Sequence, residues 1–190
     1  MDTPLTTNDN KENNANLTNN NEEVLETAVQ ADLDKIIPPE DIITDTRKEY
    51  VLGFALTPDK EKVLLITKNR PVWQEGLLNG IGGKVEEYDK DAHHAISREF
   101  MEETGITIPP EHWNKYGVME GKYFYVSLFW CFSEQLHTAQ SITDEIVSLE
   151  EIQYLLEKRF KVCIPNLSIL IGTLLDDNLE NLNIHLTYNN

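Results

Sequence analysis

Cysteine, basic residues and long apolar runs are all scarce in this sequence of 190 residues. Its two cysteines, Cys131 and Cys163, cannot form the disulfide framework of a small secreted protein, and both lie among apolar residues. The longest apolar runs, such as residues 169–175, are too short to cross a bilayer, and the polar N-terminus lacks the apolar stretch of a secretory signal. We therefore expect a soluble, cytoplasmic protein with two reduced core cysteines.

The shortage of basic residues leaves 16 Lys and Arg against 33 Asp and Glu, a formal charge of −17. This balance disfavours a long nucleic acid as the partner, because its phosphates would be repelled. A small phosphorylated substrate remains compatible with it, because bound divalent cations can invert the field inside a site. Residues 1–48 hold eleven acids and four bases and so contribute −7; the remaining −10 belongs to the rest of the chain.

Polar residues are concentrated at the N-terminus. Residues 1–45 contain nearly all of the asparagine-rich sequence, and they offer too little apolar surface to offset the entropy lost on ordering. We expect a disordered, acidic N-terminal extension there, with apolar spacing that would suit a short helix over residues 22–37 before Pro38 and Pro39 interrupt it. Residues 46–190 are expected to form the folded domain.

The domain alternates strand and helix signals. Strands are expected at residues 50–56, 63–67, 115–121, 123–132 and 145–148, the first two as a hairpin. Helices are expected at residues 91–104, 149–159 and 167–175, the first ending at Gly105. His93 and His94 are adjacent on a helix and point about 100° apart, so they cannot share one metal ion and are expected on the surface.

Residues 98–105 place several charged residues on the first of these helices. Glu99, Glu102 and Glu103 are spaced i, i+3 and i+4, so their carboxylates project from one face. Three like charges on one face cost energy unless something positive lies between them, and a hard divalent cation prefers such an oxygen-rich site. Arg98 can pair with Glu102 one turn later. The spacing alone fits a solvated acidic helix face at least as well.

A glycine cluster precedes this helix and changes that balance. Gly80, Gly82 and Gly83 supply backbone that a phosphate group can approach closely, and Lys84 follows them directly. Alone, such a cluster indicates only a tight turn. The order of glycines, lysine, acidic loop and Arg-Glu helix favours a site for phosphate and metal.

The segment GKVEEYDKDAHHAISREFMEETGI, residues 83–106, resembles the Nudix box, with the pattern G-x5-E-x7-R-E-U-x-E-E-x-G-U and U an apolar residue. The second half, from Arg98 onward, matches throughout. In the first half, the glutamate expected six residues after Gly83 is Asp89, and eight residues instead of seven separate it from Arg98. A one-residue insertion in the loop explains both differences. Glu86 or Glu87 can also stand in for the displaced acid, and the sequence does not choose between them.

The resemblance implies an α/β protein, specifically a Nudix-type α/β/α sandwich with a mixed central sheet, that hydrolyses pyrophosphate bonds with Mg²⁺ or Mn²⁺. The metal ligands that it implies are Glu99, Glu102, Glu103 and the backbone of Gly83. The catalytic residues that it implies are Glu102 or Glu103 as a base, Arg98 to orient the glutamates, and Glu145. The last of these resembles an acid that many Nudix enzymes use outside the box, although an exposed acid at the start of a strand explains it equally well.

Substrate-binding residues are expected around the glycine cluster. By resemblance, Lys84 and the Gly82 backbone contact phosphate. The stretch 78–85 is similar to that of oxidised-purine nucleoside triphosphatases of the MutT-like group, in some of which an asparagine at the position of Asn79 hydrogen-bonds the base. Asn79 also suits a turn that needs left-handed backbone. Trp73 can stack on a base, although a lone loop tryptophan more often covers the edge of a core.

These features favour hydrolysis of a nucleoside triphosphate, oxidised ones included, to a monophosphate and pyrophosphate. The first alternative is ADP-ribose, a dinucleotide or capped RNA; the proline that many ADP-ribose pyrophosphatases carry beyond the box is replaced by Gly121 and Lys122. The second alternative is a Nudix domain that senses a nucleotide without cutting it, which the altered first half of the box would suit. No membrane partner is expected, and the sequence leaves the oligomeric state open.

Overall fold

The computed structural model describes residues 47–189, apart from the side chains of residues 159–161. The extension expected over residues 1–45, including its helix over 22–37, lies outside the described residues. Within residues 47–189, no helix has both the length and the apolar character needed to span a membrane.

A mixed seven-stranded sheet forms the centre of the described part of the chain. Its strands are β1 (Lys48–Leu56), β2 (Lys62–Thr67), β3 (Leu78–Asn79), β4 (Asn114–Gly121), β5 (Phe124–Phe132), β6 (Ile146–Glu151) and β7 (Ile184–Thr187). They are ordered β3-β2-β1-β5-β4-β7. β1 and β3 pair with successive parts of one edge of β2, and β6 pairs with its opposite edge. β1 runs parallel to β5 and β4 parallel to β7, whereas the remaining pairs are antiparallel.

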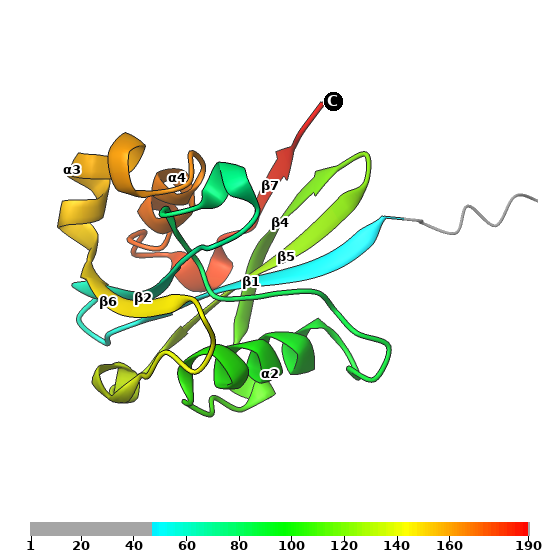
Figure 1. Ribbon diagram of the computed structural model, residues 1–190, viewed down its shortest axis with the longest axis horizontal. Helices are drawn as coiled ribbons and strands as arrows, with labels where there is room; N and C mark the ends of the chain where they lie inside the picture. The colour runs from blue at the N-terminus through cyan, green and yellow to red at the C-terminus, as the bar shows by residue number, and fades with distance from the viewer. Residues whose placement is uncertain (1–46, 190) are drawn as a thin grey trace, which may run out of the picture. The chain divides into compact units, whose positions relative to one another are not determined.

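Helices cover both faces of this sheet, which confirms the α/β/α sandwich (Figure 1). Helix α2 (Ala92–Thr104) lies on one face, and α3 (Ile152–Val162) and α4 (Leu167–Thr173) lie on the other. Short 3-10 helices in the connections are η1 (Val72–Gln74), η2 (Pro110–His112), η3 (Gln135–Thr138) and η4 (Leu179–Asn181).

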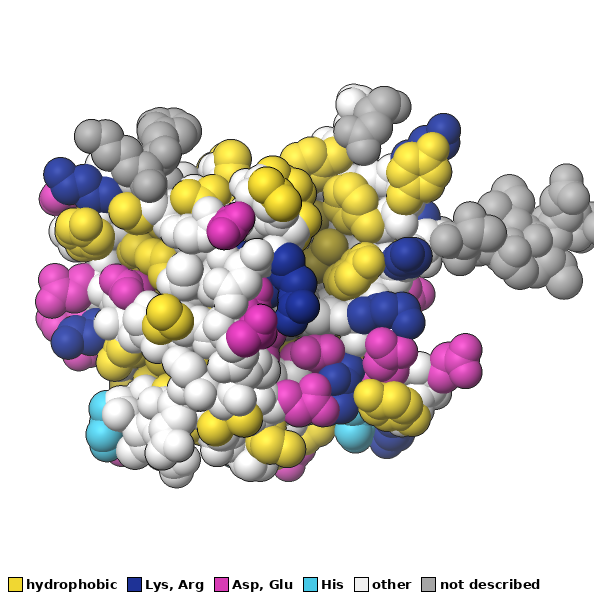
Figure 2. All heavy atoms as spheres, viewed as in Figure 1, with side chains coloured by type: hydrophobic (Ala, Val, Ile, Leu, Met, Phe, Trp, Pro, Cys, Tyr) yellow, Lys and Arg dark blue, Asp and Glu magenta, His cyan; other side chains and the backbone are white. Residues whose placement is uncertain are grey.

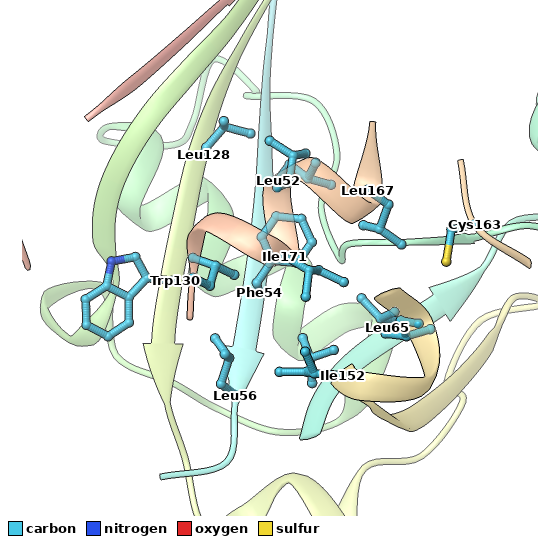
Figure 3. Packing of buried hydrophobic residues seen from close by; sticks show 14 of the residues in the cluster. Leu52, Phe54, Leu56, Leu65, Leu128, Trp130, Ile152, Cys163, Leu167 and Ile171 are labelled. Atoms are coloured by element: carbon cyan, nitrogen blue, oxygen red, sulfur yellow. The ribbon is translucent and has the colours of Figure 1, made fainter. Parts of the chain in front are cut away.

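Alternation along β1 separates two hydrophobic cores. Val51 and Ala55 belong to the core under α2, whereas Leu52, Phe54 and Leu56 belong to the core under α3 and α4. Figure 3 shows the second core, in which side chains of the sheet meet Ile152, Leu167 and Ile171 from the two helices. Successive strand residues point to opposite faces, so a strand buried on both faces must be apolar almost throughout, as β1 is.

The glycine cluster enters the sheet where β1 and β2 separate. These two strands pair only through Ala55 with Leu64 and Leu56 with Val63. Toward the N-terminal end of β1, the segment 81–84 lies beside it in place of β2, with antiparallel bridges from Gly53 to Ile81 and from Tyr50 to Lys84. The bridges fix the glycine cluster to the centre of the sheet.

Helix α2 ends at Thr104, as expected from the sequence, and begins at Ala92, one residue after the expected start, with Asp91 as its cap. The Asp91 carboxylate accepts a hydrogen bond from the backbone N–H of His94 at 3.0 Å, which satisfies one of the unpaired N–H groups of the first turn. Gly105 ends the helix with φ of 73°, a left-handed conformation that glycine adopts at little cost. These two caps fix both ends of the helix whose last two turns carry the three glutamates.

Several boundaries differ from the sequence prediction. Residues 149–151 extend β6 by pairing with residues 62–64 of β2, so α3 begins at Ile152 and not at Leu149. Strand β7 was not predicted; it forms because β4 offers a parallel edge to residues 184–187. His93 is half-buried and less exposed than expected, because its ring packs edge-on against Phe129 with centroids 4.8 Å apart. Both cysteines are buried and free, as expected.

Candidate active site

The three glutamates of α2 differ in their exposure. The Glu103 side chain is buried, the Glu99 side chain is about 15% exposed, and that of Glu102 is 49% exposed. The helix rotation places Glu103 toward the sheet and Glu102 toward solvent, with Glu99 between them. One face of the helix therefore runs from water into a low-dielectric interior, and its carboxylates are not equivalent.

Glu103 is a buried carboxylate with an unmet hydrogen-bonding capacity. Its Oε2 has no hydrogen-bond partner among the described residues. The pKa of Glu103 is raised to about 7, mainly by burial; Lys68 and the Gly82 backbone act to lower it, and the charges of Glu99 and Glu145 act to raise it. The Lys68 charge therefore compensates only part of the cost of burying this carboxylate.

Arg98 ties the loop of residues 84–89 to the acidic helix. Its Nε and Nη2 donate to the two carboxylate oxygens of Asp89 at 3.0 and 2.9 Å, and Nη2 also reaches the Lys84 carbonyl. Its Nη1 donates to Glu99 at 2.9 Å and to Glu102 at 3.1 Å. The guanidinium holds the pKa of Asp89 below its usual value. The displaced acid of the box, Asp89, thus makes a two-pronged pair with Arg98.

The other two acids in the loop are placed differently. Glu86 pairs through its side chain with Lys84 at 3.0 Å, and its backbone N–H donates to Asp89 at 2.9 Å. The Glu87 side chain is exposed. Of these three acids, Asp89 is the one that pairs with Arg98.

Gly82 and Gly83 bring the loop close to the helix and to β1. At Gly82 a side chain would collide with the Val51 carbonyl. At Gly83 a methyl group would overlap the Glu99 carboxylate, so this glycine makes the space in which that carboxylate lies. The Gly83 carbonyl accepts a hydrogen bond from the Val51 N–H at 2.9 Å and keeps a second lone pair. Close backbone approach thus requires glycine at position 82, whereas at position 83 a side chain would displace the Glu99 carboxylate.

Glu145 belongs to the same cluster, and the alternative of an exposed acid is wrong. Glu145 is only 5% exposed. One carboxylate oxygen accepts from Lys68 Nζ at 2.6 Å and the other from the Asn69 N–H at 2.9 Å. Lys68, at the start of the loop after β2, was not identified from the sequence. A single lysine at a strand end carries no pattern that separates it from an ordinary surface residue.

Of the other residues predicted to bind substrate, Asn79 and Trp73 line the cleft and Lys84 does not. Lys84 has an exposed side chain paired with Glu86 and is not among the cleft-lining residues described below. Asn79 lines the cleft, and its Oδ1 accepts from the Gly80 N–H at 2.8 Å, as a turn residue does. Trp73 lines the cleft mouth and is 65% exposed, so it does not cover a core edge.

A cleft of about 960 Å³ opens beside the acidic cluster. Its polar end includes Lys68, Gly82 and Gly83, and the rest is mostly apolar. Figure 2 shows acidic and basic side chains gathered on one face next to a group of hydrophobic ones. The other side chains and backbone that line the cleft come from Tyr50, Val51, Leu52, Arg70, Pro71, Trp73, Gln74, Asn79, Met119, Phe124, Val126, Ile164, Pro165, Asn166, Ile169 and Tyr188.

The acidic cluster suits a divalent cation chemically. The buried Glu103 Oε2 lacks a partner, carboxylate oxygens are the ligands that hard cations prefer, and the space over Gly83 holds the Glu99 carboxylate. Within residues 47–189, however, no three Asp, Glu, His or Cys side chains converge closely enough to hold a metal ion in their present orientations. Arg98 holds Glu99 and Glu102, so a cation would have to draw these carboxylates away from the guanidinium.

Comparison with known proteins agrees with this geometry. A family model described as the NUDIX domain matches residues 46–159. Among solved structures, a MutT protein from Bacillus halodurans is 17% identical with a TM-score of 0.54, over 75% of this chain and 89% of that one. A NUDIX hydrolase from Nitrosomonas europaea is 14% identical with a TM-score of 0.55, over 76% and 80%.

A third structure, a MutT/nudix family protein from Enterococcus faecalis, is 19% identical with a TM-score of 0.49 over 55% of this chain, which spans 44% of that protein. The Bacillus halodurans and Nitrosomonas europaea structures, at these identities, show the fold alone. No significant relative was found among curated protein sequences.

Proposed function

Since the chain belongs to the NUDIX domain family and is therefore a Nudix hydrolase of nucleoside diphosphate-linked compounds, we propose that its substrate is a nucleoside triphosphate. The proposed products are the nucleoside monophosphate and pyrophosphate. The observation that carries the proposal is the buried, partnerless Glu103 oxygen, close to Glu99 and to the backbone of Gly82, and Gly82 lines a large cleft.

Glu99, Glu102 and Glu103, with the second lone pair of the Gly83 carbonyl, would hold Mg²⁺ or Mn²⁺. When bound, such a cation neutralises phosphate oxygens and lowers the pKa of a bound water. The acids contribute by their different surroundings. Glu102 is half exposed and can turn away from Arg98, whereas buried Glu103 is the acid best suited to accept a proton from the attacking water.

Basic groups of the chain orient these acids and the phosphates. Arg98 holds Asp89, Glu99 and Glu102 in one hydrogen-bonded group, which limits the rotation of the glutamates. Lys68 lies between buried Glu145 and the cleft, where its ammonium can also contact a phosphate oxygen. Glu145 positions Lys68 and is the second candidate for a base.

The shape and lining of the cleft support a nucleoside as the organic part of the substrate. Aromatic side chains such as Phe124 and Tyr188 suit the face of a base, and exposed Trp73 at the mouth can stack on it. The names of two structural neighbours refer to MutT. Pairing of Asp89 with Arg98 supports a complete acidic site over a non-hydrolysing sensor, because the altered half of the box keeps its contact with the helix.

We propose that the protein acts on a small nucleotide in the cytoplasm, which is a reducing compartment. The two cysteines are buried and free, and the charge of −17 disfavours long nucleic acid.

A panel of nucleotides in Mg²⁺ tests the proposal. It should include canonical and oxidised purine triphosphates, ADP-ribose and diadenosine polyphosphates. We expect a nucleoside triphosphate to give the highest kcat/KM, and Glu102→Gln and Glu103→Gln to lower it by roughly a hundredfold or more. Full activity in both variants or in EDTA would refute the mechanism, and preference for ADP-ribose would refute the substrate.

A further inference from the structure

Tyr88 is an exposed aromatic residue in the loop that precedes α2. Its side chain is 75% exposed and belongs to neither hydrophobic core. Its hydroxyl makes no hydrogen bond to any group of residues 47–189. A single exposed aromatic residue needs no explanation by itself, so a role for Tyr88 has to come from what its ring contacts.

The ring of Tyr88 contacts the guanidinium of Arg98. The Arg98 Cζ lies over the ring, 5.5 Å from its centroid, which is within the range of a cation–π interaction. The backbone on both sides of the ring is fixed by a turn. In this turn the Asp89 N–H donates to the Glu86 carbonyl at 3.0 Å, and the Glu86 N–H donates to the Asp89 carboxylate at 2.9 Å. Tyr88 therefore lies in a closed turn, directly before the acid that pairs with Arg98.

Every N–H group of the Arg98 guanidinium already has an acceptor. Nε and Nη2 donate to Asp89, and Nη2 also donates to the Lys84 carbonyl. Nη1 donates to two glutamates of α2. These five hydrogen bonds match the five N–H groups of a guanidinium. Among the described residues, the Tyr88 ring is the partner of Arg98 that requires no N–H group.

Binding of a cation would change the surroundings of the guanidinium. Glu99 and Glu102 are proposed metal ligands, and both must leave the Arg98 Nη1 to reach a cation. The guanidinium then keeps Asp89 and the loop carbonyl, but two of its N–H groups lose their acceptors and less of its charge is neutralised. A less neutralised guanidinium is attracted more strongly by the face of an aromatic ring. The contact with Tyr88 thus contributes most in the state in which the two carboxylates are released.

We infer that Tyr88 is a positioning residue, which keeps Arg98 and the loop of residues 84–89 against α2 while a divalent cation takes Glu99 and Glu102. Without the ring, release of the two carboxylates leaves Arg98 with fewer partners. The release then costs more free energy, and the cation binds less tightly. The inference rests on the proposed function, because it assumes the cation site on the acidic helix.

Mn²⁺ alone tests the inference through its dissociation constant, measured by electron paramagnetic resonance on the full chain without nucleotide. The part of the binding that is lost in Glu103→Gln identifies the site on α2. For this site we expect Tyr88→Ala to raise the dissociation constant roughly two- to fivefold, which corresponds to an exposed cation–π contact. Tyr88→Phe keeps the ring and removes only the hydroxyl, so it should bind Mn²⁺ like the unmodified protein.

Kinetics distinguishes this role from a merely structural one. In Tyr88→Ala the Mg²⁺ concentration that gives half-maximal activity should rise roughly two- to fivefold, because the site holds its cation less tightly. The KM for the nucleotide at saturating Mg²⁺ should change by less than about twofold, because Tyr88 does not line the cleft. A damaged fold would alter both constants.

Tyr123→Ala is the matched control. Tyr123 is also an exposed tyrosine, at 65%, and the Lys122 Nζ lies over its ring at 5.0 Å from the centroid, but neither residue lines the cleft. This variant should keep the Mn²⁺ dissociation constant and the Mg²⁺ requirement of the unmodified protein.

Two results would overturn the inference alone: an unchanged Mn²⁺ dissociation constant in Tyr88→Ala, or a loss in Tyr88→Phe as large as that in Tyr88→Ala. If the unmodified protein shows no Mn²⁺ binding that depends on Glu103, the proposed function fails together with the inference. The two failures are therefore distinguishable.

Discussion

Glu103 shows how burial changes the chemistry of one residue in a charged helix. Its neighbour Glu102 is half exposed and paired with Arg98, whereas Glu103 is buried with one oxygen unpaired. A buried charge without a partner destabilises the fold, and it persists where function requires it. If Glu103 is kept for its function, the metal-free protein should have a lower free energy of unfolding with Glu103 than with an uncharged residue there.

Glu103→Gln should stabilise the metal-free protein while reducing activity. The pKa of Glu103 is about 7 in the folded protein and near 4.5 when unfolded, because burial penalises the ionised form. The penalty is absent below about pH 4.5 and complete above about pH 7, so the variant gains about 2 kcal/mol at pH 8 and much less at pH 5. Urea unfolding in EDTA at both pH values measures this. Equal stability of the two proteins at pH 8 would contradict it.

The sequence predicted that Lys84 contacts phosphate, whereas the cleft lining suggests Lys68 for that contact. Lys68→Met should lower kcat/KM by roughly ten- to a hundredfold, because a charge beside the phosphates is lost. Lys84→Met, at an exposed residue outside the cleft lining, should change it by less than about twofold. Steady-state kinetics on both variants measures the contrast, and Lys68→Arg controls for the buried Glu145, which keeps a cationic partner. A larger loss in Lys84→Met would restore the sequence expectation.

At this scale the sequence predicted residues that belong to a pattern. The spacing of Glu99, Glu102 and Glu103 identified an acidic face, and resemblance to a motif assigned it a chemistry. Lys68 belongs to no pattern, because it is a lone lysine at a strand end. It joins the site only through the fold, which places it against buried Glu145.

At the scale of elements, α2 is the part of the site whose position the sequence determines most completely. Its apolar residues bury one face, and Asp91 and Gly105 fix its two ends. Asp91 has a pKa lowered to about 2, first through its hydrogen bond with the His94 side chain and also through the His94 N–H. The ionised cap therefore stabilises the helix at neutral pH.

Asp91→Ala should destabilise the protein by about 1 kcal/mol at pH 6, because it removes the cap of α2. The folded pKa lies below the usual value of 3.8, so the contribution of the charge is fully present above about pH 4 and is lost as the pH falls toward 2. The difference between variant and unmodified protein should shrink over that interval. Chemical denaturation at pH 6 and pH 3 measures it, with Asp91→Asn as the control that keeps a capping oxygen. A difference that is the same at both pH values would contradict this.

Other elements depend on neighbours that the sequence does not show. Residues 149–151 have a helical pattern, yet they extend β6 because residues 62–64 of β2 offer backbone partners. Strand β7 has four residues and forms along the free edge of β4. Tertiary pairing outweighs local preference in both cases, so their boundaries could not be read from residue types alone.

At the scale of the whole molecule, the cleft combines segments from across the described chain. β1 supplies Tyr50, the loop after β2 supplies Lys68, the α4 start supplies Asn166, and the C-terminal segment supplies Tyr188. The sandwich was predicted correctly, through the resemblance of residues 83–106 to the Nudix box. The cleft requires knowing which strand ends lie together, which periodicity does not determine.

The central claim is that this fold joins a metal-binding acidic helix to a nucleoside-binding cleft and cleaves a nucleoside triphosphate to monophosphate and pyrophosphate. Phosphorus NMR of the products, recorded while the full chain acts on the preferred triphosphate in Mg²⁺, tests it most directly. The account predicts pyrophosphate and nucleoside monophosphate in equal amounts, and no reaction in EDTA. Release of orthophosphate with a nucleoside diphosphate, or an unchanged rate in EDTA, would contradict it.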